Sequence, residues 1–61
     1  MRTICVMVED TLANYWTVEK ITNDFPCFYN AEVKSKGYVE ISITYRQEDA
    51  KAIEDRLASI V

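Results

Sequence analysis

The order of its strand-like and helix-like stretches constrains this chain most. Alternating apolar residues predict strands over residues 2–8, 28–34 and 38–45. Apolar residues that recur every three or four positions predict helices over 12–25 and 46–60. The order is β-α-β-β-α within 61 residues, and one Gly and one Pro leave little room for long loops. We therefore expect residues 1–61 to form one small α+β domain.

Local signals bound the first helix. Glu9 and Asp10 precede Thr11, whose hydroxyl can accept a free backbone N–H at a helix start. Pro26 cannot continue a helix, so it ends this one. The stripe expected to face the core consists of Leu12, Tyr15, Val18, Thr22 and Phe25, with Ile21 beside it and Trp16 to one side.

The pattern of apolar residues also predicts the architecture. Each helix has one apolar stripe, so both helices should cover the same face of one sheet. A crossover followed by a hairpin places the first strand beside the third, in an antiparallel sheet of order 1-3-2. This is the ferredoxin-like plan without its fourth strand. The expected core is Ile4, Val6, Val8, Tyr15, Val18, Ile21, Phe25, Tyr29, Ala31, Val33, Val39, Ile41, Ile43, Ile53, Leu57 and Ile60.

In this plan the first strand lies at a sheet edge. Natural edges carry charge, Pro or a bulge that prevents pairing, and none occurs from Thr3 to Val8. A second copy or a foreign strand can pair there; alternatively, the C-terminal residues or a loop of the chain cover the edge. The residues expected to bind a protein partner are Thr3, Cys5 and Met7 on the strand, with Trp16, Phe28 and Tyr38 as aromatic anchors.

The two cysteines predict a reducing compartment. Cys5 and Cys27 lie on strands that flank the third, so their backbones should be about 9–10 Å apart. A disulfide needs Cα atoms within about 7 Å. Reduced thiols indicate a cytoplasmic protein. No apolar run is long enough to span a membrane, and we expect no leader at the N-terminus.

The composition argues against catalysis. The chain has no His, the side chain most often used for acid–base chemistry. Cys27 follows Pro26 and has no basic residue close in sequence to activate it. Two Cys without His cannot close a tetrahedral zinc site. The sequence therefore predicts a protein that is not an enzyme and needs no metal or cofactor.

Nucleic-acid binding is the alternative. The stretch from Lys36 to Ile43 resembles the basic-Gly-aromatic opening of the third strand of an RNA-recognition motif. Val39 stands where that motif has Gly or Ala, and Glu40 stands where an aromatic would stack. Seven basic against ten acidic residues, a net charge of −3, argue against holding a phosphate backbone. The single-stranded RNA or DNA would contact Phe28, Lys34, Lys36 and Tyr38.

These observations favour a small acidic module that binds protein and acts by occlusion or assembly rather than by catalysis. The partner is expected to be a second copy, paired through the first strand, or a host protein. The size and the charge are compatible with the inhibitors that phages and mobile elements direct at host proteins, which is an analogy and rests on no motif.

Overall fold

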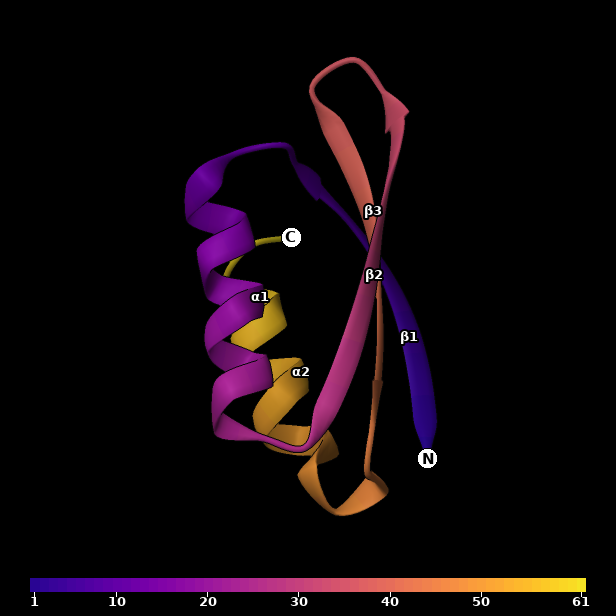
Figure 1. Cartoon of the computed structure of the whole chain (residues 1–61), viewed down its shortest axis with the longest axis vertical. Helices are drawn as coiled ribbons and strands as arrows, with labels where there is room; N and C mark the ends of the chain where they lie inside the picture. The colour runs from indigo at the N-terminus through magenta and orange to yellow at the C-terminus, as the bar shows by residue number, and fades with distance from the viewer.

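The computed structural model describes all 61 residues. The elements are β1 (Arg2–Glu9), α1 (Leu12–Asp24), β2 (Cys27–Ser35), β3 (Tyr38–Tyr45), a 3₁₀ turn (Gln47–Asp49) and α2 (Ala50–Ala58). Both helices lie on one side of the sheet (Figure 1). No element of the chain covers the other face, which is called the outer face below.

The sheet has the predicted topology. Its order is β1-β3-β2, and β3 pairs antiparallel with both neighbours. This confirms the α+β class, the antiparallel sheet and the strand order. The prediction considered β1 alone as an edge, whereas β2 forms the second edge of the sheet.

The predicted ends of α1 are also confirmed. Thr11 is the residue before the helix, and its Oγ1 accepts a 3.2 Å hydrogen bond from the N–H of Asn14. Such a cap satisfies one of the N–H groups that a helix start leaves free. At the other end, the N–H of Phe25 donates to the carbonyl of Ile21, and Pro26 follows.

The core lies between the sheet and the helices. Tyr45, absent from the expected core, is fully buried because its hydroxyl has a partner: it donates a 2.7 Å hydrogen bond to Oε2 of Glu54 on α2. Ile60 is only half-buried. The buried residues are Val8, Val18, Ile21, Val39, Ile41, Ile43, Tyr45, Ala50, Ile53 and Leu57.

Two expected core positions are wrong, and so is the orientation expected for one residue of the first helix stripe. Ala31 and Val33 are exposed, Val33 by 68%. The β2–β3 hairpin extends beyond the start of α1, so no helix covers the inner side of its far end (Figure 1). Leu12 is 88% exposed. A helix turns roughly 100° per residue, which places Leu12 about 120° from the buried Val18.

The second helix is shorter than predicted. Arg46 has extended backbone (φ −76°, ψ 142°), the 3₁₀ turn follows, and the α-helix begins only at Ala50 and ends at Ala58. The Arg46 side chain holds this turn, because its Nε donates to Oδ2 of Asp49 at 3.1 Å. The predicted pair of Lys51 and Asp55 is present at 3.4 Å.

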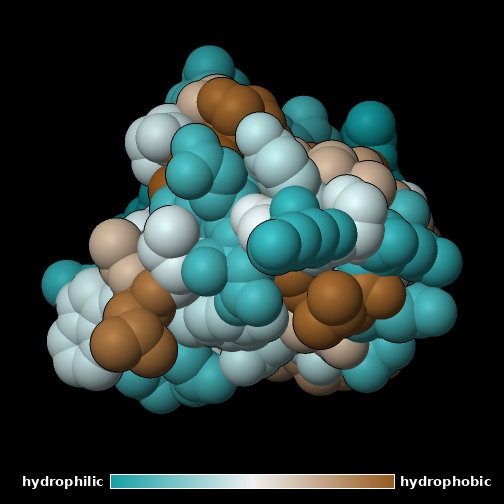
Figure 2. Space-filling view, turned by 90° about the horizontal axis from the view of Figure 1, so that it is seen from above, coloured by the Kyte–Doolittle hydropathy of each residue, from teal (hydrophilic) through white to brown (hydrophobic).

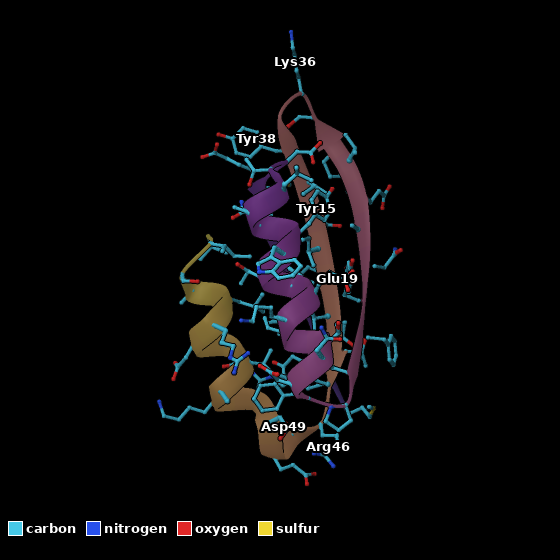
Figure 3. The ribbon with its side chains drawn as sticks, turned by 60° about the vertical axis from the view of Figure 1, so that its left-hand side comes forward. Tyr15, Glu19, Lys36, Tyr38, Arg46 and Asp49 are labelled. Atoms are coloured by element: carbon cyan, nitrogen blue, oxygen red, sulfur yellow. The ribbon has the colours of Figure 1, made fainter.

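Polar contacts tie the two helices to the sheet and to each other. The Tyr29 hydroxyl of β2 donates a 2.6 Å hydrogen bond to Glu19 of α1. Tyr15 and Glu19 point from α1 towards the hairpin, while Lys36 lies at its tip and extends away from the body (Figure 3). Arg56 of α2 contacts Asp24 at 2.6 Å, at the end of α1.

Candidate functional site

The backbone of β1 presents an open edge. One step beyond the pair of Glu9 and Tyr38, the N–H of Asp10 donates a 2.9 Å hydrogen bond to the carbonyl of Gly37. Residues of an antiparallel strand alternate between pairs that exchange hydrogen bonds with the neighbour and pairs that do not. Asp10 belongs to the set of residues that exchange backbone hydrogen bonds with β3. The backbone N–H and C=O groups of the even-numbered residues of β1 therefore bond to β3. The outward N–H and C=O groups belong to Thr3, Cys5 and Met7.

Glu9, at the end of the open edge, shows the same alternation of backbone hydrogen bonds. The Glu9 carbonyl accepts 2.9 Å hydrogen bonds from the Thr11 N–H and from Nδ2 of Asn14. It therefore points away from β3, as its odd number requires, and it is satisfied within the chain. The residues of β1 with both an outward N–H and a free outward C=O are therefore Thr3, Cys5 and Met7.

The two sheet edges differ in protection. The pairing of β1 with β3 runs from Arg2 to Glu9 without a register shift, and between these ends β1 has no charged residue and no Pro. The β2 edge follows Pro26, carries Glu32 and Lys34, and has a register irregularity near its end. These are the usual guards against strand addition. Only the β1 edge is open to a further strand.

The outer face of the sheet beside this edge is mixed in polarity. Thr3 Oγ1 lies 2.9 Å from Thr44 Oγ1, and Cys5 Sγ lies 3.3 Å from Ser42 Oγ. Met7, half-exposed, stands opposite Glu40. Small side chains joined by hydrogen bonds therefore line the first strand, and the one large apolar group there is Met7.

A charged group occupies the β2 side of the same face. Glu32 stands directly opposite Glu40 on β3. Lys34 lies between them, with its Nζ 3.4 Å from Glu32 and 3.9 Å from Glu40. Because two carboxylates share one ammonium, this part of the face is negative and repels a phosphate backbone.

The residues expected to contact a nucleic acid do not form one platform. Phe28 pairs with Thr44, six residues along β3 from Tyr38, so the two rings lie about 20 Å apart along the strand. Lys34 is held by two carboxylates, and Lys36 projects from the hairpin tip (Figure 3). Neighbouring bases of a single-stranded nucleic acid could therefore not stack on both the Phe28 and the Tyr38 ring.

Five of the six residues expected to bind protein fall into two groups, and the sixth, Tyr38, lies opposite Glu9 at the hairpin end of β3. Thr3, Cys5, Met7 and Phe28 share the outer face of the sheet, because their side chains alternate with residues that face the helices. Trp16, 68% exposed, lies on the opposite side of the molecule, on α1. The structure therefore joins the strand residues and separates Trp16 from them.

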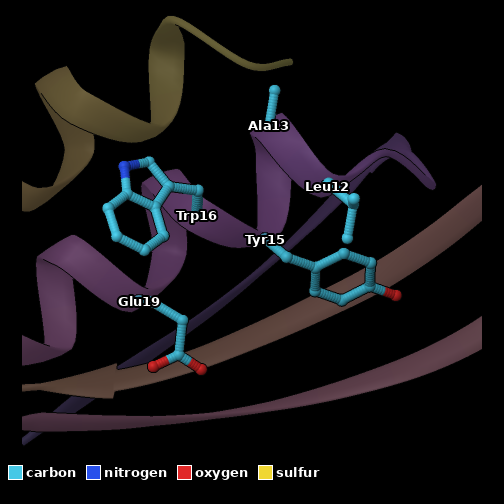
Figure 4. A pocket seen from close by; sticks show the side chains of 5 residues that line it. All are labelled: Leu12, Ala13, Tyr15, Trp16 and Glu19. Atoms are coloured by element: carbon cyan, nitrogen blue, oxygen red, sulfur yellow. The ribbon is translucent and has the colours of Figure 1, made fainter.

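The surface around Trp16 forms a shallow apolar pocket on α1. Leu12, one turn before it, is the exposed residue that the sequence pattern had placed in the apolar stripe of the helix. Tyr15 and Glu19 turn towards the strands (Figure 4). Seen from the hairpin end, apolar atoms form separate patches among hydrophilic ones (Figure 2). The pocket is lined by Leu12, Ala13, Tyr15, Trp16 and Glu19.

The perturbed ionisable groups are structural. Burial and a hydrogen bond to Glu54 raise the pKa of Tyr45. The hydrogen bond to Glu19 and burial raise the pKa of Tyr29. Burial and the nearby Asp49 raise the pKa of the Cys27 thiol, which makes it a poorer nucleophile at neutral pH. None of these shifts produces an activated base or thiolate.

The thiols lie on opposite faces of the sheet. Cys5 lies on the exposed outer face, whereas Cys27 faces α1, where its Sγ lies 3.8 Å from the carbonyl of Ile21. Both are free. No cluster of three or more Cys, Asp and Glu side chains is arranged to hold a metal ion. Neither helix has the length and apolar character needed to cross a bilayer.

Comparisons with known proteins give no relative. The chain matches no family model, no curated protein and no solved structure.

Sequence reasoning missed the phase of the β1 hydrogen bonds and the exposure of Leu12. The alternation of side chains assigns each residue to a face of the sheet, but it does not say which N–H groups bond to which neighbouring strand. For Leu12 a signal was available: its six-residue spacing from Val18 departs from the helical repeat.

Proposed function

We propose that this protein is a non-catalytic protein-binding module that binds an extended segment of a protein partner along the edge of β1. The observation that carries this proposal is the run of three residues, Thr3, Cys5 and Met7, whose outward N–H and C=O groups are unpaired on an unguarded edge. In strand addition, such backbone groups supply the affinity and alternate side chains supply the specificity.

The fold and the chemistry of the surface support this mode of action. The β-α-β-β-α order favours a ferredoxin-like sheet that lacks its fourth strand, which leaves β1 at the edge. A strand added at β1 would extend the outer face past Cys5 and Met7, both accessible there. The module would act by covering a segment of its partner or by assembling with it.

A synthetic extended peptide of alternating Thr and Val is a suitable probe for this edge. Its addition to the protein should slow amide hydrogen exchange at Thr3, Cys5 and Met7, measured by NMR. The neighbouring amides of Ile4 and Val6 already bond to β3, so they should change little. Unchanged exchange at the three outward amides, up to millimolar peptide, would exclude strand addition at β1.

Two substitutions at one position provide the matched control. Cys5→Pro removes an outward N–H but leaves the ladder to β3 intact, a placement that edge strands tolerate. Cys5→Ser keeps the N–H. The peptide should slow the exchange of the Thr3 and Met7 amides in the Ser variant and not in the Pro variant. If the Pro variant proves unfolded by circular dichroism, Met7→Lys replaces it, because a Lys on an edge opposes pairing. Equal protection of the blocked and control variants would contradict the proposal.

A further inference from the structure

We infer that the partner strand is β1 of a second copy of this chain, paired antiparallel about a two-fold axis that passes beside Cys5. This inference rests on the proposed function and names the partner of the same edge. It joins two three-stranded sheets into one of six strands, in the order 2-3-1-1-3-2, with all four helices on one face.

The outward groups of β1 are self-complementary about Cys5. Thr3 and Met7 lie two residues before and after it, and all three carry outward N–H and C=O groups. With Cys5 on the axis, Thr3 of each copy stands opposite Met7 of the other. Every pair then exchanges both hydrogen bonds, about six in total, which uses the outward N–H and C=O groups of all three residues.

The chain itself restricts other registers. If the two β1 strands slipped by one residue, an outer-face side chain of one copy would stand opposite an inner-face side chain of the other. The helices of the two copies would then lie on opposite faces of the joined sheet. A two-fold axis beside Val6 would bring Thr3 opposite Glu9. The Glu9 carbonyl, however, is already bonded to Thr11 and to the side-chain amide of Asn14. Of these registers, the one centred on Cys5 pairs all three outward residues with one another.

The inner side of β1 gains apolar contacts in this arrangement. Ile4 and Val6 face the helix layer but are only half-buried, since α1 packs mainly on α2 and β2. With Cys5 on the axis, Ile4 stands opposite Val6 of the second copy, in the closely spaced type of pair. Two such pairs would cover apolar surface that one copy leaves half-exposed.

The charges at the two ends of β1 are complementary in an antiparallel pair. The strand begins at Arg2 and is followed, at its other end, by Glu9 and Asp10. Antiparallel alignment brings the basic start of each copy next to the acidic end of the other. Diagonal neighbours on paired strands lie about 7–8 Å apart, within reach of a long side chain. The Arg2 and Asp10 side chains lie on the same, inner side of the strand. Arg2, whose Nε lies 3.7 Å from Glu54 of its own chain, also lies within reach of Asp10 of the second copy.

Molar mass and a cross-link at Cys5 test the inference together. Light scattering under reducing conditions should give twice 7.1 kDa as the concentration rises. In a Cys27→Ser background, oxidised glutathione should then convert two Cys5 thiols to an intermolecular disulfide and release two molecules of reduced glutathione. Paired residues that exchange both hydrogen bonds have Cα atoms about 5.5 Å apart, within the range of a disulfide.

Two control variants fix the register. Thr3→Cys and Met7→Cys, each combined with Cys5→Ser and Cys27→Ser, place the two copies of the new thiol about 13 Å apart along the strands. They should cross-link far more slowly than Cys5. Equal rates at the three positions, or a monomeric mass at every concentration, would overturn the inference. A monomer whose outward amides are still protected by the Thr–Val peptide overturns the second copy as partner but leaves the proposed function standing.

Discussion

The hydroxyl of Tyr45 donates a 2.7 Å hydrogen bond to Oε2 of Glu54, which joins the end of β3 to the middle of α2. Arg2 of β1 approaches the same carboxylate, with its Nε 3.7 Å from Oε2. One carboxylate thus links an edge strand, the central strand and a helix. Tyr45 itself is fully buried, so its hydroxyl depends on this partner.

Alkaline pH should weaken the fold through this tyrosine. Burial, and then the bond to Glu54, raise the pKa of Tyr45 above its ordinary value of 10.0. The unfolded chain therefore loses the proton first. The stabilisation is fully present below the unfolded pKa and is lost as pH rises through the folded pKa. Urea unfolding at about pH 8 and about pH 11 should show a lower free energy of unfolding at the higher pH.

Tyr45→Phe separates this residue from the others. The pKa values of three other groups, Tyr15, Tyr29 and the Cys27 thiol, are also raised in the folded protein. Part of the alkaline decrease in the free energy of unfolding should therefore remain. The Phe variant should lose about 1 kcal/mol at neutral pH, for the missing hydrogen bond, and should show a smaller alkaline decrease than the wild type. An unchanged alkaline decrease would contradict the role assigned to Tyr45.

Trp16 should contribute little to stability. It lies on the exposed side of α1, whereas Ile53 of α2 is fully buried. Trp16→Ala should change the free energy of unfolding by no more than about 0.5 kcal/mol, apart from the small gain in helix propensity. Ile53→Ala should cost about 2–5 kcal/mol because it leaves a cavity. Urea unfolding measures both, and similar losses would mean that Trp16 packs on the core.

Lys34 should stabilise the sheet by separating two carboxylates. Lys34→Met leaves Glu32 opposite Glu40, and these partly exposed groups then repel each other. The expected loss is about 0.5 kcal/mol, larger at low than at high salt. Glu32→Gln in the Lys34→Met background should recover most of it. A loss that is independent of salt would point to lost packing by the Lys stem instead.

Much of the fold could be predicted from the sequence because its patterns are local. The strand predicted over 38–45 has the observed bounds, since its alternation is regular and both its neighbours are strands. The start of α2 was wrong because acidic residues mark a helix start equally well when a 3₁₀ turn precedes it. Glu48 and Asp49 belong to that turn rather than to the first turn of the α-helix.

The remaining errors concern tertiary packing. Ala31 and Val33 alternate correctly towards the helix side, but alternation does not say how far a helix reaches along that face. The interaction surface was predicted at Thr3, Cys5 and Met7 from their side chains. The reason to choose these residues over their neighbours is the direction of their backbone N–H groups, which only the strand pairing determines.

Amide hydrogen exchange along β1, measured by NMR from dilute to concentrated protein, distinguishes an edge that pairs with a second copy from one that does not. In dilute solution the outward amides of Thr3, Cys5 and Met7 should exchange fast, and the amides of Ile4, Val6 and Val8 should exchange slowly. At high concentration the outward amides should become slow as the molar mass doubles. Outward amides that are slow at every dilution would mean that the chain covers its own edge. Outward amides that stay fast while the mass doubles would place the interface elsewhere. Either result would contradict the pairing of two copies through β1.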